Sequence, residues 1–551
     1  MRKDPSGWCV TLDGGTASSY VRSGQWHNRT LLDEFQRLVT ANPNWPAIVQ
    51  GDTVVTRREL LAQAQALAVS FLSFGLGKGA VVSVMLPNWP EAAIVDLAAT
   101  MTGMVFNPIV PIYRAAETSF ILRDCKSSVL FIPQSFRGFD YVRMIQGIRG
   151  DLPSLRHIIV VRATETVPDM LGWRESASGE GRVIDEPSPL APEPDSVKLV
   201  LYTSGTTGPA KGVLHSHNTI GAEIHNVAAH WALSSADTVF MPSPLTHITG
   251  YLYGIQMPLT VGMTAVYLDQ WNPEVAFALL EQHRCSWTVA ATPFLRELLD
   301  IAETSNRTLP QLRYFACGGA PVSPGLIYAA RRTFSSCITC RIYGSTEAPT
   351  VTLGPKARED ERAATTDGVV VGHQFKLVNS EGRKVHDREE GELLTRGAEM
   401  FLGYTNIADN GEAFDPDGYF RTGDLACEVE PGWLRITGRV KDLIIRGGEN
   451  ISAKEVEDVL HRHPSIHEAA VVAMPHPRLG ETCCAFVIPK QGRTLTLSEV
   501  AEFIATSGLA KQKTPERLEF VREFPRTASG KIRKVELRSI IAEKLASERP
   551  E

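Results

Sequence analysis

The stretch that decides the fold of this chain is Val197-Lys198-Leu199-Val200-Leu201-Tyr202-Thr203-Ser204-Gly205-Thr206-Thr207-Gly208-Pro209-Ala210-Lys211-Gly212. It opens with an apolar run bounded by polar residues, which is typical of a buried strand. Hydroxyl residues and glycines then follow, and Lys211 closes the run. Glycines let backbone N–H groups turn toward an anion, hydroxyls donate to phosphate oxygens, and the lysine adds positive charge. The stretch therefore predicts a strand followed by a loop that wraps a nucleotide triphosphate.

Two other interpretations of this loop are less favoured. An ordinary Gly/Ser/Thr surface loop would not need the preceding strand and the closing lysine together. A Walker A loop ends in Gly-Lys-Ser/Thr, whereas the order here is Ala210-Lys211-Gly212, so we do not expect a P-loop NTPase. An amphipathic helical pattern resumes near Asn218, and Ser216 suits its N-cap.

The composition sets broad limits. A length of 551 residues is too great for one compact core, so we expect two or more domains. The net charge of −6, without a block of basic residues, argues against nucleic acid as a partner. No apolar run reaches the roughly 18 residues of a membrane span, so none is expected. Nine cysteines without regular spacing indicate reduced thiols and a cytoplasmic location.

Strand and helix patterns alternate from about residue 31 to residue 343, which predicts an α/β fold with parallel sheets flanked by helices. Residues 1–27 show no clear periodicity, and we expect them to form an arm. Polar or Gly-rich loops follow several strands, at Pro242–Gly250, Gly318–Pro321 and Gly344–Glu347. Ligands bind just past the carboxyl ends of parallel strands, so we expect these loops to form one site.

The pattern changes in the second half of the chain. Short strands and turns from about Gly368 to Gly432 predict a small β-rich subdomain. A compact α+β segment follows the strand that ends near Arg439. We therefore expect an N-terminal domain of residues 1–438, a hinge at 439–441 and a C-terminal α+β lid domain of residues 442–551.

The phosphate-loop stretch resembles that of the adenylate-forming superfamily, which contains acyl-CoA synthetases, peptide-synthetase adenylation domains and beetle luciferase. The family pattern is Thr-Ser-Gly-Thr-Thr-Gly-x-Pro-Lys-Gly. Here Ala210 precedes the lysine, and the proline stands one residue earlier, at Pro209. Further motifs follow in the family's order, and the resemblance covers nearly the whole chain past residue 30. It implies an enzyme that uses ATP, CoA and Mg²⁺.

Two more motifs extend the implied nucleotide site. Tyr343-Gly344-Ser345-Thr346-Glu347 resembles the family segment whose tyrosine packs on adenine and whose glutamate holds magnesium, a metal that prefers oxygen ligands. Gly418-Tyr419-Phe420-Arg421-Thr422-Gly423-Asp424 resembles the segment whose aspartate binds both ribose hydroxyls. A surface turn with a capping glutamate is the alternative for the first motif, and Asp424 standing alone would more often be a turn residue. The residues implied to bind nucleotide are Thr203, Ser204, Gly205, Thr206, Thr207, Gly208, Lys211, Gly319, Ala320, Tyr343, Gly344, Thr346, Asp424 and Arg439, with Glu347 as the metal ligand.

Three further motifs imply catalysis and domain motion. Pro525-Arg526-Thr527-Ala528-Ser529-Gly530-Lys531 resembles the loop that carries the family's catalytic lysine, so Lys531 would stabilise charge on the phosphate oxygens. Gly438-Arg439-Val440-Lys441-Asp442 resembles the family hinge, with Lys441 at the pivot. Gly447 and Gly448 would lie against the pantetheine arm of CoA. A tight turn before a helix is the alternative for these two glycines.

His247 lies in a Pro-Leu-Thr-His-Ile-Thr-Gly loop that resembles the family segment beside the acyl carboxylate. A lone histidine near an apolar strand is more often a satisfied core residue, and that alternative stays open. The resemblance implies that His247 lines the acyl pocket and contributes to catalysis. Gly250, Gly318 and Gly319 would be its neighbours, and such small residues would leave room for a bulky acyl group.

The implied reaction joins a carboxylic acid to CoA through an acyl-adenylate. The segments Leu214–Thr219 and His247–Gly250 are similar to ligases for cyclohexanecarboxylate, which favours a bulky alicyclic or terpenoid-like acid. A medium-chain fatty or aromatic acid is the alternative, and a carrier-protein loading enzyme is less favoured. The departure at Pro209-Ala210 also leaves open an enzyme competent mainly in thioester formation from acyl-AMP made elsewhere. The oligomeric state is not determined by the sequence, and a homodimer remains open.

Overall fold

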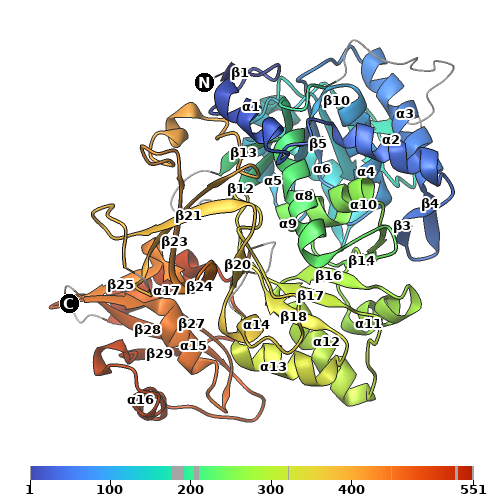
Figure 1. Cartoon of the computed structure of the whole chain (residues 1–551). Coiled ribbons are helices and arrows are strands. Elements are labelled where there is room, and N and C mark those ends of the chain that lie inside the picture. The colour runs from blue at the N-terminus through green and yellow to red at the C-terminus, as the bar shows by residue number, and fades with distance from the viewer. Residues whose placement is uncertain are drawn as a thin grey trace.

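The computed structural model describes residues 2–174, 192–203, 210–319, 322–386, 388–447, 449–527 and 531–548. Parallel sheets flanked by helices form the first part of the chain, and an antiparallel sheet follows them (Figure 1). A smaller α+β part, coloured orange to red in Figure 1, contains the C-terminus. The predicted α/β fold with a β-rich subdomain is therefore confirmed. Among the described helices, none combines the length and apolarity needed to cross a lipid bilayer.

The first sheet contains the strand that opens the phosphate-loop stretch. Its strand order is β11-β10-β7-β5-β6-β12-β13, and every neighbouring pair is parallel except β12 with β13. The central strands are almost wholly apolar, as expected for strands covered on both faces. The bounds are β5 Val81–Val84, β6 Val105–Pro108, β7 Val129–Pro133, β10 His157–Val161, β11 Leu171–Gly172, β12 Val197–Thr203 and β13 Lys211–Ser216.

The second sheet has the order β18-β17-β16-β14-β15-β3-β4, and it is parallel except for the β3–β4 pair. The loops predicted to form the site follow β14, β17 and β18. Because these strands are parallel, the loops emerge at the same edge of the sheet. The bounds are β3 Pro46–Gln50, β4 Thr53–Thr56, β14 Thr238–Met241, β15 Thr264–Tyr267, β16 Trp287–Ala290, β17 Tyr314–Cys317 and β18 Ile338–Arg341.

Helix α4 (Pro90–Met101) lies between these sheets, in contact with β3 of one and with β5 and β6 of the other. Its faces are buried all round, which is typical of a core helix. Its one buried carboxylate, Asp96, lies 2.6 Å from the Lys198 ammonium and accepts hydrogen bonds from Tyr251 and Gln256. Removing either charge would leave the other buried and unpaired, which costs about 3–5 kcal/mol.

Most of the other helices cover the faces of the sheets and connect the strands. Several begin at the side-chain caps that the sequence supplies, such as Thr56 with Glu59 at α3. The bounds are α1 Gly14–Arg22, α2 Leu31–Ala41, α3 Arg57–Ser73, α5 Ala115–Asp124, α6 Tyr141–Ile148, α8 His217–Trp231, α9 Ile248–Gly250, the π-helical turn η2 Tyr251–Gln256, α10 Met257–Val261, α11 Pro273–Gln282, α12 Thr292–Ser305, α13 Pro324–Thr333 and α14 Arg362–Thr365.

The β-rich subdomain is an antiparallel sheet with the order β19-β20-β24-β23-β22-β21. Its position in the chain agrees with the predicted change of pattern between Gly368 and Gly432. The bounds are β19 Thr352–Leu353, β20 Gly368–Val370, β21 His373–Val378, β22 Gly391–Gly397, β23 Phe420–Glu430 and β24 Trp433–Arg439.

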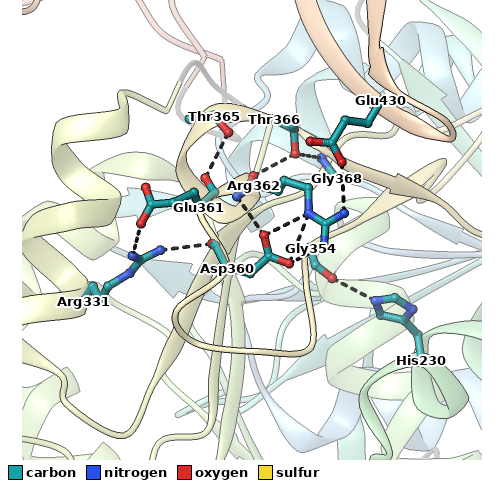
Figure 2. Close-up of polar contacts among 10 residues, drawn as sticks. All are labelled: His230, Arg331, Gly354, Asp360, Glu361, Arg362, Thr365, Thr366, Gly368 and Glu430. Atoms are coloured by element: carbon teal, nitrogen blue, oxygen red, sulfur yellow. Dashed lines mark hydrogen bonds and ion pairs between the residues drawn. The ribbon is translucent and has the colours of Figure 1, made fainter.

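Charged side chains connect this subdomain to the sheet domain (Figure 2). Arg331 on α13 donates to the Glu361 carboxylate at 2.7 Å and to the backbone carbonyl of Asp360 at 3.1 Å. Arg362 donates to both carboxylate oxygens of Asp360 and, at 3.2 Å, to Glu430 at the end of β23. The segment between β19 and β20 is thereby held against both parts of the structure.

The C-terminal part is a sheet of order β26-β25-β28-β27, with β29 parallel to β28. Residues of β27 and β28 alternate between two apolar clusters, so Cys483 packs with α15 and α16 while Cys484 packs with α17. The two cysteines therefore belong to the core of this part. The bounds are β25 Leu443–Arg446, β26 Glu449–Ser452, α15 Ala453–Leu460, β27 Ile466–His476, β28 Gly480–Pro489, α16 Leu497–Thr506, β29 Arg517–Phe520 and α17 Lys534–Glu548.

Residues 1–27, expected from their lack of periodicity to form an arm, contain regular structure and pack against the rest of the chain. This segment forms β1 (Arg2–Lys3), β2 (Cys9–Val10) and α1, which begins at the Asp13 cap. The Trp26 side chain is buried and its Nε1–H donates to the Ala398 carbonyl at 2.8 Å. Helix α1 buries only Ala17, so it has no apolar stripe that a periodicity argument would detect.

Candidate active site

The phosphate-loop stretch is a hairpin between β12 and β13, whereas the sequence had suggested only one strand before the loop. Thr203 and Lys211 are paired residues of the two strands. Ser216, at the end of β13, caps α8 by accepting from the Thr219 N–H, as predicted. The loop residues predicted to bind nucleotide, Ser204, Gly205, Thr206, Thr207 and Gly208, lie outside the described residues, as does Pro209.

Lys211 points away from its strand toward a carboxylate that the sequence had not indicated. Its Nζ lies 3.0 Å from Asp409 Oδ1 and 4.9 Å from the centre of the Tyr404 ring. The lysine side chain is 41% exposed, so solvent screens this pair. A phosphate would therefore compete with Asp409 for the ammonium at low energetic cost.

Glu347, the predicted metal ligand, is held by Tyr404. The tyrosine O–H donates to Glu347 Oε1 at 2.9 Å, and the Glu347 backbone carbonyl accepts from the Phe401 N–H. Among the described residues, this is the one hydrogen bond made to the carboxylate. A carboxylate with an oxygen still able to coordinate fits Mg²⁺, which takes one or two such ligands besides phosphate oxygens.

The backbone around Thr346 is fixed by a buried histidine. His215 Nε2 lies 2.8 Å from the Thr346 carbonyl, and burial lowers the pKa of His215 to about 4. The imidazole is therefore neutral, and since a carbonyl only accepts, Nε2 carries the proton. Gly344 leaves no room for a side chain, because a Cβ there would lie 1.9 Å from the Pro349 carbonyl oxygen. These contacts set the course of the Tyr-Gly-Ser-Thr-Glu segment.

Tyr343, Asp424 and Arg439 form one hydrogen-bonded group. The Tyr343 O–H donates to Asp424 Oδ2 at 2.6 Å, and Arg439 Nε donates to Asp424 Oδ1 at 2.9 Å. The Asp424 side chain is buried, and its charge raises the pKa of Arg439. An ionised carboxylate offers about four lone-pair positions, so Asp424 retains capacity for a ribose diol.

Lys531 lies close enough to this group and to Glu347 for their charges to act on its ammonium. Burial lowers the pKa of Lys531 to about 8, with a further contribution from the positive charge of Arg439. The negative charges of Asp424 and Glu347 act in the opposite direction. A Cβ placed on Gly319 would lie 3.7 Å from Lys531 Cε. The structure therefore brings Lys531 together with Gly319, Glu347, Asp424 and Arg439, all of which the sequence had singled out.

The loop that carries Lys531 is closed by Thr527. The Thr527 N–H donates to the Lys531 carbonyl at 2.7 Å, and the Lys531 N–H donates to Thr527 Oγ1 at 3.1 Å. Arg526 pairs with Ile532 in an antiparallel bridge. The backbone on both sides of the loop is thus defined, which fixes where the lysine side chain leaves the chain.

His247 is the residue immediately before α9. Burial, and to a lesser extent the nearby charge of Lys531, lower its pKa to about 4, so the imidazole is neutral at pH 7. A Cβ on Gly250 would lie 2.0 Å from the Pro244 carbonyl, and one on Gly318 would lie 2.8 Å from Ile342. Packing alone therefore explains why both positions are glycine, and the assignment of these glycines to an acyl pocket stays a prediction.

The remaining predicted residues lie in several places. Ala320 and Gly448 lie outside the described residues. Gly447 is in the exposed turn between β25 and β26, with φ +60°, and its N–H donates to the Leu479 carbonyl at 2.8 Å. Lys441 is in the short 3₁₀ turn η4 (Val440–Asp442) directly after β24.

Comparison with known families now identifies the class of protein. Residues 35–405 match the family model of the AMP-binding enzyme, and residues 455–531 match that of the AMP-binding enzyme C-terminal domain. The chain therefore belongs to the adenylate-forming AMP-binding enzyme family. It is an enzyme of the AMP-forming acid–thiol ligase type, which acts on ATP and a carboxylic acid.

Individual relatives cover almost the whole chain. A medium-chain fatty-acid–CoA ligase of Escherichia coli is 35% identical over 547 residues, covering 98% of this chain and 95% of the relative. A Mycobacterium tuberculosis ligase for 3-[(3aS,4S,7aS)-7a-methyl-1,5-dioxo-octahydro-1H-inden-4-yl]propanoyl-CoA is 31% identical over 515 residues, or 93% and 99% of the two chains.

Solved structures confirm the fold. The anthranilate CoA ligase AuaEII, in complex with anthranoyl-AMP, superposes with a TM-score of 0.85 at 23% identity, covering 95% of this chain and 98% of that one. ATP-bound MatB from Rhodopseudomonas palustris has a TM-score of 0.80 at 25% identity, covering 93% and 99%.

Proposed function

We propose that this enzyme is an acyl-CoA synthetase that works through an acyl-adenylate and acts on a bulky alicyclic or terpenoid-like acid. A carboxylic acid and ATP would give acyl-AMP and pyrophosphate. Attack by the CoA thiol would then give the thioester and AMP. The observation that carries this proposal is the position of Lys531 beside Glu347, Asp424 and Arg439.

In the first half-reaction, the carboxylate oxygen attacks the α-phosphorus, and negative charge grows on the phosphate oxygens. A preorganised ammonium stabilises that charge in a site with little water, and Lys531 is the group we assign to this role. Mg²⁺ bound through Glu347 would neutralise further phosphate charge. Asp424 and Arg439 would hold the ribose, and Tyr343 would pack on adenine.

In the second half-reaction, Lys531 would first move away from the acyl-AMP. The CoA thiol would then reach the acyl carbonyl. We propose that residues 442–551 rotate as a lid relative to residues 1–438, with the φ and ψ changes concentrated at the hinge 439–441. A few residues at the end of an element commonly absorb such changes, and Lys441 follows β24 directly. Gly447 and Gly448 would then line the path of the CoA pantetheine arm.

The neutral His247 would act as a wall of the acyl site rather than as an acid or base. With a pKa of about 4 its imidazole carries no charge at pH 7, so it neither attracts nor repels the acid electrostatically. It is assigned a positioning role beside the acyl carboxylate. The large alicyclic group named for the M. tuberculosis relative supports a bulky acid here.

A medium-chain fatty acid is the second candidate substrate, because the E. coli relative is a medium-chain fatty-acid–CoA ligase. ATP–pyrophosphate exchange with cyclohexanecarboxylate, octanoate and benzoate would separate these classes. The proposal expects the highest kcat/KM with the alicyclic acid and CoA-thioester formation in the complete reaction. A preference for octanoate would replace the alicyclic assignment.

A carrier-protein loading enzyme is a further candidate. A salicyl-AMP ligase of M. tuberculosis, also named salicyl-S-ArCP synthetase, is 30% identical over 543 residues, which favours testing this class. Exchange activity with no thioester product when CoA is supplied would support carrier loading. Rapid thioester formation from synthetic acyl-AMP without exchange would instead support an enzyme limited to the second half-reaction.

A further inference from the structure

Three side chains that can bind a metal converge outside the nucleotide site. They are His27 in the segment before α2, Glu34 on α2 and His225 on α8. One ligand atom from each lies within 4.8 Å of the other two. The three residues come from separate segments of the chain, so the tertiary fold and not local sequence brings them together.

The side chains line a small cavity of about 10 Å³, partly open to solvent, which has room for a single water molecule or ion. Two oxygens of residues that line it, Glu34 Oε1 and Thr260 Oγ1, are buried and have no hydrogen-bond partner. Buried oxygens without partners are rare in folded proteins and indicate an additional group at the site. A cation at the centre would satisfy the Glu34 carboxylate directly.

We propose that His27, Glu34 and His225 bind one first-row transition-metal ion, with Zn²⁺ as the best match. Two imidazoles and one carboxylate are typical ligands for zinc, whereas Mg²⁺ and Ca²⁺ prefer sites made of oxygens. The bound ion would hold the N-terminal segment against α2 and α8. Helix α8 starts at His217, directly after the strand that leaves the phosphate loop, so the ion would also stabilise the base of the nucleotide site.

Binding requires a small rearrangement. Ligand atoms of a tetrahedral zinc site lie about 3.4 Å apart, closer than the present limit of 4.8 Å. The His27 and His225 rings now lie with their centroids 3.8 Å apart and their planes tilted by 35°, and the centroids would separate to about 5 Å when both rings bind one ion. His27 is exposed, so its side chain is able to move.

Two arginines already lie near the Glu34 carboxylate that the proposed metal ion would bind. Arg29 NH1 lies 3.5 Å from Glu34 Oε1, and Arg37 NH1 lies 3.6 Å from Oε2. Both distances exceed those of good charge-assisted hydrogen bonds, and the side chains are 44% and 55% exposed. The ion would replace Arg29 at Oε1, while Arg37 stays near Oε2.

The test begins with the full chain, freed of metal by a chelator and titrated with Zn²⁺ or Co²⁺ in the presence of excess Mg²⁺. The proposal expects one equivalent of Zn²⁺ retained after dialysis, visible absorption bands of four-coordinate Co²⁺, and a higher melting temperature with Zn²⁺. Retention of no metal, with an unchanged melting temperature, would overturn the proposal and leave one water as the occupant of the cavity.

Matched variants locate the site. His225→Ala and Glu34→Gln should each weaken Zn²⁺ binding at least about 100-fold, more than the loss of a partner that only orients a ligand. His467→Ala removes another exposed histidine, on β27, and should bind like the wild type. Equal Zn²⁺ affinity in His225→Ala and His467→Ala would show adventitious binding elsewhere. Because Glu34→Gln keeps the side-chain shape, it reports on binding even where His225→Ala folds poorly.

Discussion

Raising the pH from 7 to 9.5 should remove the charge that the proposed adenylation step requires from Lys531. Burial, and then the charge of Arg439, lower the pKa of this lysine from 10.5 to about 8. The ammonium is the acid form, so it is present below that pKa and is lost as the pH rises through it. The first half-reaction should therefore slow on the alkaline side, where an ordinary lysine would still be protonated.

The size of the effect follows from the pKa. At pH 7 about nine tenths of the Lys531 side chains carry the charge, and at pH 9 about one tenth do. The kcat/KM for ATP reports the free enzyme, so it should fall about tenfold for each pH unit above 8. Bound ATP adds negative charge near the ammonium, so the decline in kcat should begin at a higher pH.

The assay is ATP–pyrophosphate exchange between pH 6.5 and 9.5, with thioester formation from synthetic acyl-AMP as the control. Lys531→Arg retains a charge with a pKa above about 12, so its residual activity should show no decline near pH 8. Lys531→Ala should lose about 10²–10³-fold in exchange and largely keep the second half-reaction. A wild-type profile that is flat to pH 9.5, or the same alkaline decline in Lys531→Arg, would refute the reasoning.

Three other substitutions test neighbouring parts of the site. Tyr404→Phe removes the hydrogen bond to Glu347 and should raise the Mg²⁺ concentration needed for half-maximal exchange about fivefold, since such a bond contributes about 1 kcal/mol; an unchanged Mg²⁺ requirement would contradict this role. Lys441→Pro should impair thioester formation more than exchange, because proline fixes φ near −65°; equal rates in both assays would exclude Lys441 as the pivot. Gly319→Leu should reduce exchange with every acid, and most with bulky ones, because φ is +78° there and the new side chain would meet Lys531. Unchanged exchange with octanoate and cyclohexanecarboxylate alike would place Gly319 outside the acyl site.

The fold and much of the site were predictable because each depends on local patterns. Buried strands such as β7 and β14 are short, mainly apolar runs, and helix α8 begins at a side-chain cap. The residues around Lys531 belong to motifs that are contiguous in sequence, so each can be found without knowing what it contacts. The rule that ligands bind past the carboxyl ends of parallel strands places Gly319 and Glu347 at one edge of the second sheet. That Asp424, Arg439 and Lys531 join them was implied by the family resemblance, because the first two lie on antiparallel strands and the third on the C-terminal part.

Other parts of the site were not predictable because they depend on contacts between distant segments. Tyr404 lies 57 positions from Glu347, and nothing in its own neighbourhood indicates that its O–H reaches that carboxylate. Asp409 is one of many exposed acids until the fold places it beside Lys211. His215 is buried in β13, a strand that the sequence had not indicated. Each is a tertiary contact without a periodic or local signal.

Proline stands at position 209 of the phosphate loop and not directly before Lys211, and the structure limits which part of the loop this change can affect. The two ends of the loop are fixed, because Thr203 and Lys211 are paired across β12 and β13. Ala210 is partly buried against the apolar cluster that contains Tyr202 and Leu214, so its methyl group has a packing role that proline would have to preserve. The departure at Pro209-Ala210 can therefore change how the loop presents its hydroxyls and N–H groups, but not where the loop leaves and rejoins the sheet. Any loss of adenylation traced to this loop would reflect the conformation between those fixed ends. It would leave the contacts of Lys531, Asp424 and Arg439 as they are, and with them the capacity to bind the acyl-AMP formed or supplied.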